Sequence, residues 1–329
     1  MKITMAHGSG GKATGDLIQN IFQKYLGNKY LDKMADSAFL PASSYPLALT
    51  TDSFVITPLE FPGGDIGKLA VCGTVNDLWM AGAEPQFLTA GFILEEGLDL
   101  KLLERVVASL GQTAKEAGVQ VVAGDTKVIE GQGGLIINTA GVGYRKHSPE
   151  LLTGELNIGD AVILSGSLGN HQACILSQRL EIENNIVSDC ADLGPLVRGL
   201  LQAGLKVRLF RDVTRGGLGT ILNEIAQEAC VGIEIEETAL PIDIEVSSFC
   251  EILGLDPLYM ANEGKFVCLV SPDDEKQALK ILRNNPLGKN SALIGRITRT
   301  DRALVTMNTR IGGKRIIDVL YGEGLPRIC

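Results

Sequence analysis

Short apolar runs typical of strands alternate with helical patterns along this chain of 329 residues. Such alternation indicates α/β architecture, because each helix needs a sheet face on which to bury its apolar stripe. Polar residues and a proline interrupt both patterns at residues 145–149, and the length suits two domains of ordinary size. We therefore predict two α/β (α+β) domains at residues 1–150 and 151–320, followed by a flexible tail at 321–329.

The spacing of apolar residues locates the elements. Leu103, Val106 and Leu110 belong to a helical stripe that closes at Gly118, a residue type favoured just after a helix. In the first domain we expect strands at 48–52, 119–123 and 135–143 and helices at 69–83 and 102–117. In the second we expect strands at 161–164, 207–210, 231–235 and 266–270 and helices at 193–201, 218–229 and 272–282.

Charge restricts the possible partners. The chain has thirty lysine and arginine residues against thirty-nine aspartate and glutamate residues, for a formal net charge of −9. An acidic chain is not broadly attracted to nucleic acid or to anionic membranes. We therefore expect no nucleic-acid partner and no membrane association, and phosphate would have to be bound through local donors or a metal ion.

The seven cysteines form no C-x-x-C pair, so their spacing does not favour a zinc or iron–sulfur site. Their odd number also fits poorly with a complete disulfide framework. The N-terminus has no apolar run typical of a signal peptide, and no stretch of membrane-spanning length lacks polar residues. These features predict a cytoplasmic protein.

Three aspartates stand beside small residues at expected strand or helix ends: Asp52, Asp77 and Asp125. Carboxylates at such edges can converge on Mg²⁺, which prefers oxygen ligands and shares them with phosphates. The alternative for each is a turn cap. Asp77 is the strongest candidate, because it lies in the apolar run 71–83, where an unpaired charge is costly to bury.

Two glycine-rich segments are candidate phosphate sites. Gly8, Gly10, Gly11 and Lys12 could wrap a phosphate, although neither the Walker spacing nor the dinucleotide fingerprint is present and an unliganded loop is the alternative. The segment 211–219 lies between an expected strand and helix, so its glycines could meet an anion at the helix start. Asp212 there would be a further metal ligand, and a plain tight turn is the alternative.

Three further side chains stand apart from these motifs. Glu263, just before the strand expected at 266–270, could act as a base, and a solvated loop acid is the alternative. His7 and His171 have no spaced partner, so we expect each to be a polar loop residue.

The chain ends on Cys329, whose thiol adjoins the terminal carboxylate. Gly322 and Gly324 provide flexible joints before it and Pro326 stiffens the last residues. Counted from Leu320, an extended tail would reach roughly 30 Å. The neighbouring carboxylate disfavours a thiolate, so this cysteine is a poor free nucleophile and is better suited to carrying a substrate group.

These segments, together with residues 73–77 and the terminal Pro326-Arg327-Ile328-Cys329, resemble the HypE family of hydrogenase-maturation proteins. That family belongs to the aminoimidazole-ribonucleotide synthetase (PurM-like) superfamily. The resemblance covers nearly the whole chain, and the terminal four residues are its most specific part. It implies a two-domain PurM-like fold in which an N-terminal sheet domain forms the dimer and a C-terminal α/β sandwich precedes a flexible tail.

The resemblance also implies an activity. In the HypE family a carbamoyltransferase, HypF, loads a carbamoyl group onto the terminal cysteine, and dehydration with ATP converts it to a thiocyanate. The cyanide then passes through a HypC–HypD scaffold complex to the iron of nickel–iron hydrogenase. ATP and Mg²⁺ are thus the implied cofactors. HypF, HypC–HypD and a second copy of the chain, with ATP between subunits, are the implied partners.

Residue roles follow from the matching motifs. Cys329 would carry the substrate, Lys127 would stabilise developing charge and Glu263 would remove a proton. The implied Mg²⁺ ligands are Asp52, Asp77, Asp125 and Asp212. The implied nucleotide-binding residues are Gly8, Gly10, Gly11, Lys12, Asp52, Asn76, Asp77, Thr126, Thr214, Gly216 and Gly217.

Three alternatives stay open at this point, and one of them, thiamine-monophosphate kinase activity, would leave the terminal cysteine unexplained. A selenophosphate synthetase of the same superfamily usually has a cysteine or selenocysteine in its N-terminal glycine loop, and here no cysteine precedes Cys72. A nucleotide-regulated carrier would present the modified cysteine without dehydrating it. The motifs around Asp77, Lys127 and Glu263 favour the enzyme.

Overall fold

A computed structural model describes residues 1–147, 152, 154–299 and 303–319. The chain divides into two compact units: the first comprises residues 1–60 and 64–146, and the second comprises residues 61–63 and the described residues from 147 onward. The tail predicted to be flexible, including Cys329, lies outside the described residues.

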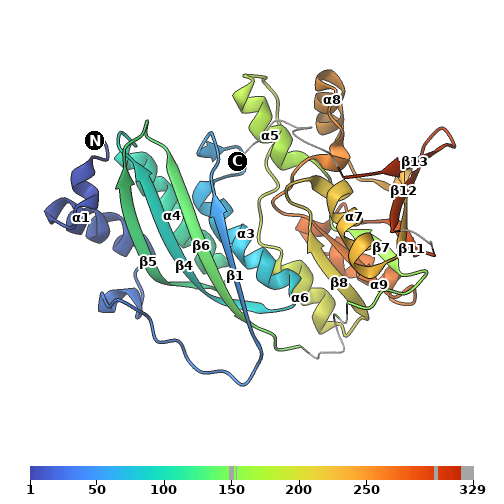
Figure 1. Ribbon diagram of the computed structural model, residues 1–329, viewed down its shortest axis with the longest axis horizontal. Helices are drawn as coiled ribbons and strands as arrows, with labels where there is room; N and C mark the ends of the chain where they lie inside the picture. Colours follow the sequence, from blue (N-terminus) through green and yellow to red (C-terminus); the bar gives the residue numbers. More distant parts are fainter. Residues whose placement is uncertain (148–151, 153, 300–302, 320–329) are drawn as a thin grey trace. The chain divides into compact units, whose positions relative to one another are not determined.

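The N-terminal unit is built on a four-stranded sheet in the order β1-β6-β4-β5 (Figure 1). Neighbours are antiparallel except β4 and β5, which run parallel. A short hairpin of β2 (Glu60–Phe61) and β3 (Gly64–Asp65) lies where residues 61–63, which are assigned to the second unit, interrupt the first. The strands of the N-terminal unit's main sheet are β1 (Leu47–Phe54), β4 (Glu84–Glu95), β5 (Gln120–Ile129) and β6 (Leu135–Tyr144). Its helices are α1 (Lys12–Leu17), α2 (Gln23–Leu26), α3 (Ile66–Met80) and α4 (Leu100–Glu116), with the π-helical turn η2 (Ile18–Phe22) and the 3₁₀ helices η1 (Met5–Gly8) and η3 (Leu31–Lys33).

Helices α3 and α4 lie behind one face of this sheet (Figure 1). Both begin at an aspartate cap: Asp65 accepts hydrogen bonds from Gly67 N and Lys68 N, and Asp99 accepts them from Lys101 N and Leu102 N. Such caps satisfy amides that have no partner within the helix. The predicted helices 69–83 and 102–117 are thus confirmed with shifted ends.

The twelve-residue strand β4 was not predicted. Pro85, Gln86 and Gly91 interrupt its apolar pattern, so no simple period stands out in the sequence. In the structure Leu88, Ala90, Phe92 and Leu94 alternate onto the helix face and are buried. Its central place between β6 and β5 supplies pairing partners that local propensity does not report.

The C-terminal unit contains a seven-stranded sheet in the order β13-β12-β9-β11-β7-β10-β8. Its strands are β7 (Ala161–Leu164), β8 (Val207–Asp212), β9 (Gly232–Glu236), β10 (Phe266–Val270), β11 (Ala292–Thr298), β12 (Leu304–Asn308) and β13 (Lys314–Ile317). Its helices are α5 (Asn170–Arg179), α6 (Gly194–Gln202), α7 (Gly217–Ala229), α8 (Ile244–Leu253) and α9 (Glu275–Arg283), with the 3₁₀ helices η4 (Glu237–Ala239), η5 (Pro257–Tyr259) and η6 (Pro286–Gly288). The predicted mixed α/β class is confirmed, whereas α5, α8 and β11 to β13 were not predicted.

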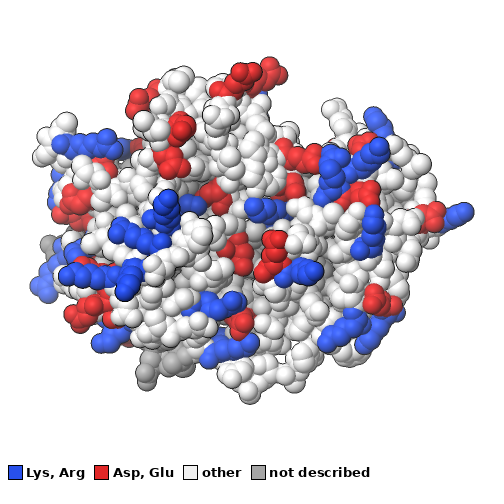
Figure 2. Space-filling view, turned by 180° about the vertical axis from the view of Figure 1, so that it is seen from behind, with Lys and Arg blue, Asp and Glu red and all other residues white. Residues whose placement is uncertain are grey.

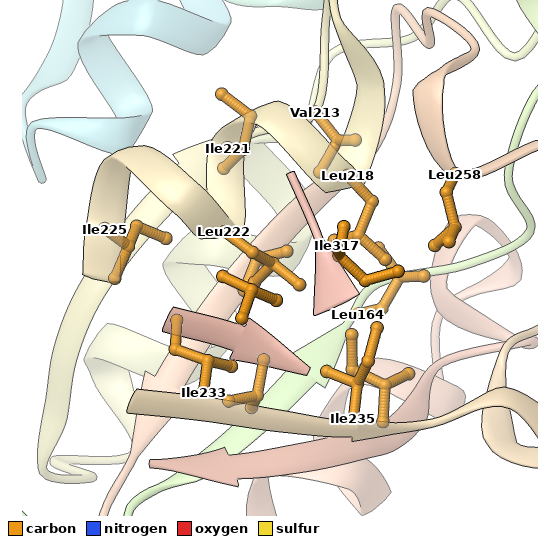
Figure 3. Close-up of a cluster of buried hydrophobic side chains, with 14 of the residues drawn as sticks. Leu164, Val213, Leu218, Ile221, Leu222, Ile225, Ile233, Ile235, Leu258 and Ile317 are labelled. Carbon is orange, nitrogen blue, oxygen red and sulfur yellow. The ribbon is translucent and has the colours of Figure 1, made fainter. Parts of the chain in front are cut away.

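The core of this unit lies between α7 and the sheet. Figure 3 shows Leu222 and Ile225 of α7 directed toward Ile233 and Ile235 of β9. The buried cluster continues through strands β7, β10, β11 and β12. Burial of a large aliphatic side chain contributes roughly 1.5–3 kcal/mol, so this interface holds the turn before α7 on a rigid base.

Charged side chains of both signs are interspersed over the face seen in Figure 2. Within the described residues, no helix has the length and apolar character needed to cross a membrane.

Candidate active site

Asp52 and Asp77 form an acidic pair in the N-terminal unit. Asp77 is half-buried on α3, and its carboxylate accepts a 2.8 Å hydrogen bond from the Thr50 hydroxyl of β1. Burial raises the pKa of Asp77 above its usual value; the Thr50 bond opposes this, and the charge of Asp52 adds to it. Two adjoining carboxylates, one of them poorly hydrated, form a site that a hard cation would neutralise.

Asp125 and Lys127 lie elsewhere on the same sheet. Across the sheet, Asp52 of β1 pairs with Thr139 of β6, Thr139 pairs with Ala90 of β4, and Ala90 pairs with Gly124 of β5. Strands β1 and β5 are therefore three strand spacings, or roughly 14 Å, apart. Asp125 is one residue beyond this row, so it points to the opposite face from Asp52. Lys127 Nζ lies 3.6 Å from Asp125 Oδ2, and their side chains are 69% and 72% exposed.

Two expectations about the carboxylates need correction. Asp125 was expected at the end of a strand, but β5 continues to Ile129, because pairing with β4 supports the strand beyond the glycine. Within the N-terminal unit, Asp125 also does not converge with Asp52 and Asp77, and among the described residues no three His, Cys, Asp or Glu side chains form a metal-binding group. Asp52 and Asp77 are brought together, and Asp125 is not brought to them.

The N-terminal glycine segment lies against β5. A Cβ atom on Gly8 would come within 2.9 Å of Val128, so only glycine allows this approach. Gly10 has a φ of 79° and donates its N–H to the Thr14 hydroxyl at 3.0 Å, and Gly11 precedes α1, whose first residue is Lys12. The predicted phosphate loop therefore adjoins the strand that carries Asp125, Thr126 and Lys127.

A pocket of about 290 Å³ opens between the N-terminal helical segment and strands β4 and β5. Its lining includes Thr14, Phe22, Tyr30, Phe92, Gly124 and Thr126. Aromatic walls beside backbone and hydroxyl groups suit a planar heterocycle. No sequence pattern marks this pocket, because its walls come from three separate segments of the chain.

In the C-terminal unit, the structure brings together the two remaining predicted motifs. The turn between β8 and α7 carries Asp212, Thr214, Gly216 and Gly217; Gly217 N donates to Thr214 O at 3.0 Å. Val213 N donates to Lys265 O at 2.8 Å, and Asn262 N donates to Val213 O at 3.2 Å. The turn and the Glu263 loop are thus adjacent.

The segment 188–191, which holds the Glu263 loop, was not among the residues predicted for the site. Asp189 Oδ1 accepts a hydrogen bond from Glu263 N at 3.1 Å, and Asp189 Oδ2 pairs with Lys265 Nζ at 3.1 Å. No motif or periodicity marks this segment, so only the fold reveals its contact with residues 263–265.

His171 was predicted to be a polar loop residue, and this is wrong. It lies on α5 with 1% of its surface exposed, and its Nδ1 is 2.8 Å from Ser188 Oγ. Burial lowers its pKa to about 4 although the charge of Asp189 acts in the opposite direction. The isolated histidine gave no sign of its helix, because α5 itself has no clear apolar stripe.

We expect this histidine to make the fold acid-sensitive. Unfolded chains bind the proton near the ordinary pKa of 6.5, whereas the folded state stays neutral down to about pH 4. Stability should therefore fall as the pH drops from 6.5 to 4, by about 3 kcal/mol at most. Urea unfolding midpoints should fall less steeply over this range for His171→Gln than for wild type. Equal slopes for His171→Gln and wild type would contradict the prediction.

Comparison with known proteins identifies the family. Residues 34–144 match the N-terminal domain and residues 157–308 the C-terminal domain of AIR synthase related proteins. The carbamoyl dehydratase HypE of Rhodobacter capsulatus is 48% identical over 100% of this chain and 98% of its own length. The chain belongs to the HypE family.

Other HypE proteins agree with this. HypE of Escherichia coli K12 is 44% identical over 99% of each chain. A crystal structure of HypE in complex with ATP superposes with a TM-score of 0.94 at 44% identity, covering 99% of each chain. The HypE subunit in a HypE–HypF complex has a TM-score of 0.79 at 43% identity, covering 92% of this chain and 99% of that one.

Proposed function

We propose that the chain is a carbamoyl dehydratase that uses ATP to convert an S-carbamoyl group on its own Cys329 into a thiocyanate, the source of a cyanide ligand for hydrogenase iron. The main support for this function is the sequence similarity, over the whole chain, to carbamoyl dehydratases of the HypE family. The family's sequence motifs at Asp77, Lys127, Glu263 and Cys329 are all present.

The reaction can be written so that atoms balance. The carbamoyl oxygen attacks the γ-phosphorus of ATP and ADP leaves, which turns a poor leaving group into phosphate. Both N–H protons are lost and the C–O bond breaks, so the products are the nitrile, ADP, phosphate and one net proton. Such a reaction needs a base, a cation at the developing charge and a site that orients the phosphates.

Two residues would take the roles of base and cation. Glu263 would accept the N–H proton, and Lys127 would balance negative charge on the activated oxygen. Lys127 is exposed and its present partner is Asp125 at 3.6 Å, an ion pair weak enough to exchange for a phosphate.

Mg²⁺ fits the acidic pair of the N-terminal unit. Asp52 and Asp77 would hold it, because burial and the charge of Asp52 both disfavour an unneutralised Asp77 carboxylate and raise its pKa. When bound, the metal would neutralise triphosphate charge. Asp125 and Asp212 are further candidate ligands.

The nucleotide would lie near β5. The pocket beside Thr126 suits the adenine ring, and Gly8, Gly10, Gly11 and Lys12 adjoin the same strand. Asn76, Thr214, Gly216 and Gly217 complete the nucleotide-binding residues that we propose.

We propose that the chain forms a homodimer through the sheet of its N-terminal unit. The sheet face opposite α3 exposes Leu47 (60%) and Leu49 (69%) of β1, and the partly exposed Ile93 and Ile136 lie farther along the same face. A second copy would cover this apolar face. Asp125 and Lys127 lie on this covered face, so we propose that ATP is bound between the subunits.

HypF is the proposed donor of the carbamoyl group, since a relative forms a complex with it. A HypC–HypD complex is the proposed acceptor of cyanide. The six cysteines within the described residues are free thiols, which favours the cytoplasm. We place the domains at 1–150 and 151–320, with 321–329 as the tail that carries Cys329.

Intact-mass spectrometry tests the proposed function. The chain is incubated with HypF, ATP and carbamoyl phosphate under conditions that load the tail, and Mg-ATP is then supplied to the isolated adduct. We expect a carbamoyl adduct that is absent in Cys329→Ser and that loses the mass of water with Mg-ATP. An adduct that forms and never loses water would favour a carrier, and an adduct elsewhere than Cys329 would overturn the proposal.

A further inference from the structure

Both backbone groups of Glu263, its N–H and its C=O, are hydrogen-bonded to the segment 189–191. Glu263 N donates to Asp189 Oδ1 at 3.1 Å, and Ala191 N donates to Glu263 O at 3.3 Å. A residue fixed at both its N–H and its C=O has little freedom in φ and ψ. The segment 189–191 therefore sets the direction in which the Glu263 side chain leaves the backbone.

A buried ion pair reinforces this arrangement. Asp189 and Lys265 have side chains only 6% and 11% exposed, and Lys265 Nζ lies 3.1 Å from both Asp189 Oδ2 and Gly264 O. Burying two charges is costly, and such a pair is weak evidence for added stability. A geometric role is the better explanation, because the same lysine also binds the carbonyl next to Glu263.

Gly264 allows the Glu263 loop to pack closely against the segment 189–191. A Cβ atom at this position would lie 1.9 Å from Asp189 O, a separation that no side chain permits. The loop can therefore lie directly on the segment 189–191.

The supporting segment is itself anchored. Ser188 Oγ contacts His171 Nδ1 at 2.8 Å and accepts from Cys190 N at 3.1 Å. Ser188 N donates to Pro62 O at 2.9 Å. On the other side, Asn262 Oδ1 accepts from Gly169 N at 2.7 Å, so both flanks of the loop are fixed.

We propose that Asp189 and Lys265 are positioning residues for the dehydration: through the peptide of Glu263 they hold its carboxylate in one orientation for proton removal. This inference rests on the proposed function. Neither residue needs to touch the substrate. A misplacement of about 1 Å at a reacting group can cost on the order of 100-fold in rate.

Two double variants separate positioning from charge. Asp189→Asn with Lys265→Met removes both charges and keeps an oxygen that can accept from Glu263 N–H. Asp189→Ala with Lys265→Met removes both charges and that acceptor. We expect the first to lose water within about threefold of the wild-type rate and the second to be 10- to 100-fold slower, with an unchanged KM for ATP.

The controls distinguish this inference from the function on which it rests. Failure of the wild-type adduct to lose water, or a wild-type rate in Glu263→Gln, would remove the base assignment itself. With Glu263→Gln slow, equal rates for the two double variants would overturn the positioning role alone.

Hydrogen exchange of the unaltered chain keeps the inference testable even if a double variant fails to fold. The Glu263 amide should exchange as slowly as the paired amides of β10. Rapid exchange at Glu263, with β10 protected, would show that the loop is not held and would overturn the proposal.

Discussion

Glu263→Gln should slow ATP-dependent water loss from the carbamoylated chain by about 10²- to 10⁴-fold, the usual contribution of a general base. The amide is nearly isosteric and leaves both peptide hydrogen bonds of residue 263 intact, so the loop should keep its conformation. The glutamine cannot accept the N–H proton. Carbamoylation by HypF should proceed as before, because that step occurs on another enzyme.

The measurement is a time course of intact mass after Mg-ATP is added to the purified adduct. Glu245→Gln is the matched control, since Glu245 is exposed in the first turn of α8. It should lose water at the wild-type rate. Water loss by Glu263→Gln at that same rate would show that another group removes the proton.

Asp77→Asn should weaken Mg-ATP binding and stabilise the protein that has no metal or nucleotide bound. We expect a loss of Mg-ATP affinity of at least roughly tenfold, because disturbing even the partners of metal ligands typically costs that much. In the absence of metal and nucleotide, the variant should be more stable than wild type at pH 7. A charged Asp77 is poorly hydrated and lies near Asp52, and the neutral amide removes both penalties.

The pKa shift of Asp77 determines how the stability of the protein changes with pH. The folded-state pKa of Asp77 lies above its ordinary value of 3.8, so the folded chain binds the proton more tightly than the unfolded chain. Stability is therefore lost as the pH rises from 3.8 through the folded-state pKa, and it stays lower at neutral pH. Asp77→Asn should not show this loss.

Calorimetric titration with Mg-ATP and thermal unfolding between pH 4 and pH 7 measure the two effects. Asp273→Asn, at an exposed position before α9, controls for removal of one negative charge. Wild-type affinity in Asp77→Asn would remove this residue from the metal site. A lower unfolding temperature than wild type at pH 7 would contradict the account of its burial.

The sequence was most informative where a pattern is local. The apolar helix ending near Met80, the amphipathic α4 and the strands β7 and β10 all follow from periodicity within one segment. The turn before α7 was also predicted, because its glycines lie between a short apolar strand and a helix. Strand β4 and helices α5 and α8 were missed, since their residues depend on partners far away in the chain.

The candidate site shows the same division. The family motifs predicted Asp77, Lys127 and Glu263 as site residues, because such motifs depend only on residue identity. Asp189 has no motif, and its relation to Glu263 exists only because the chain returns past the loop between α5 and α6. His171 was misjudged for the same reason: its burial comes from tertiary packing around Ser188.

By itself, the amino-acid sequence determined the α/β class, the family and the residue types available for the chemistry, since these depend on local periodicity and on side-chain identity. The tertiary structure decided which of those residues meet. It pairs Asp52 with Asp77 and separates Asp125 from both, because strand order and side-chain alternation act over several strands. It also places the Glu263 peptide against the buried Asp189–Lys265 ion pair, a contact that no local sequence pattern predicts.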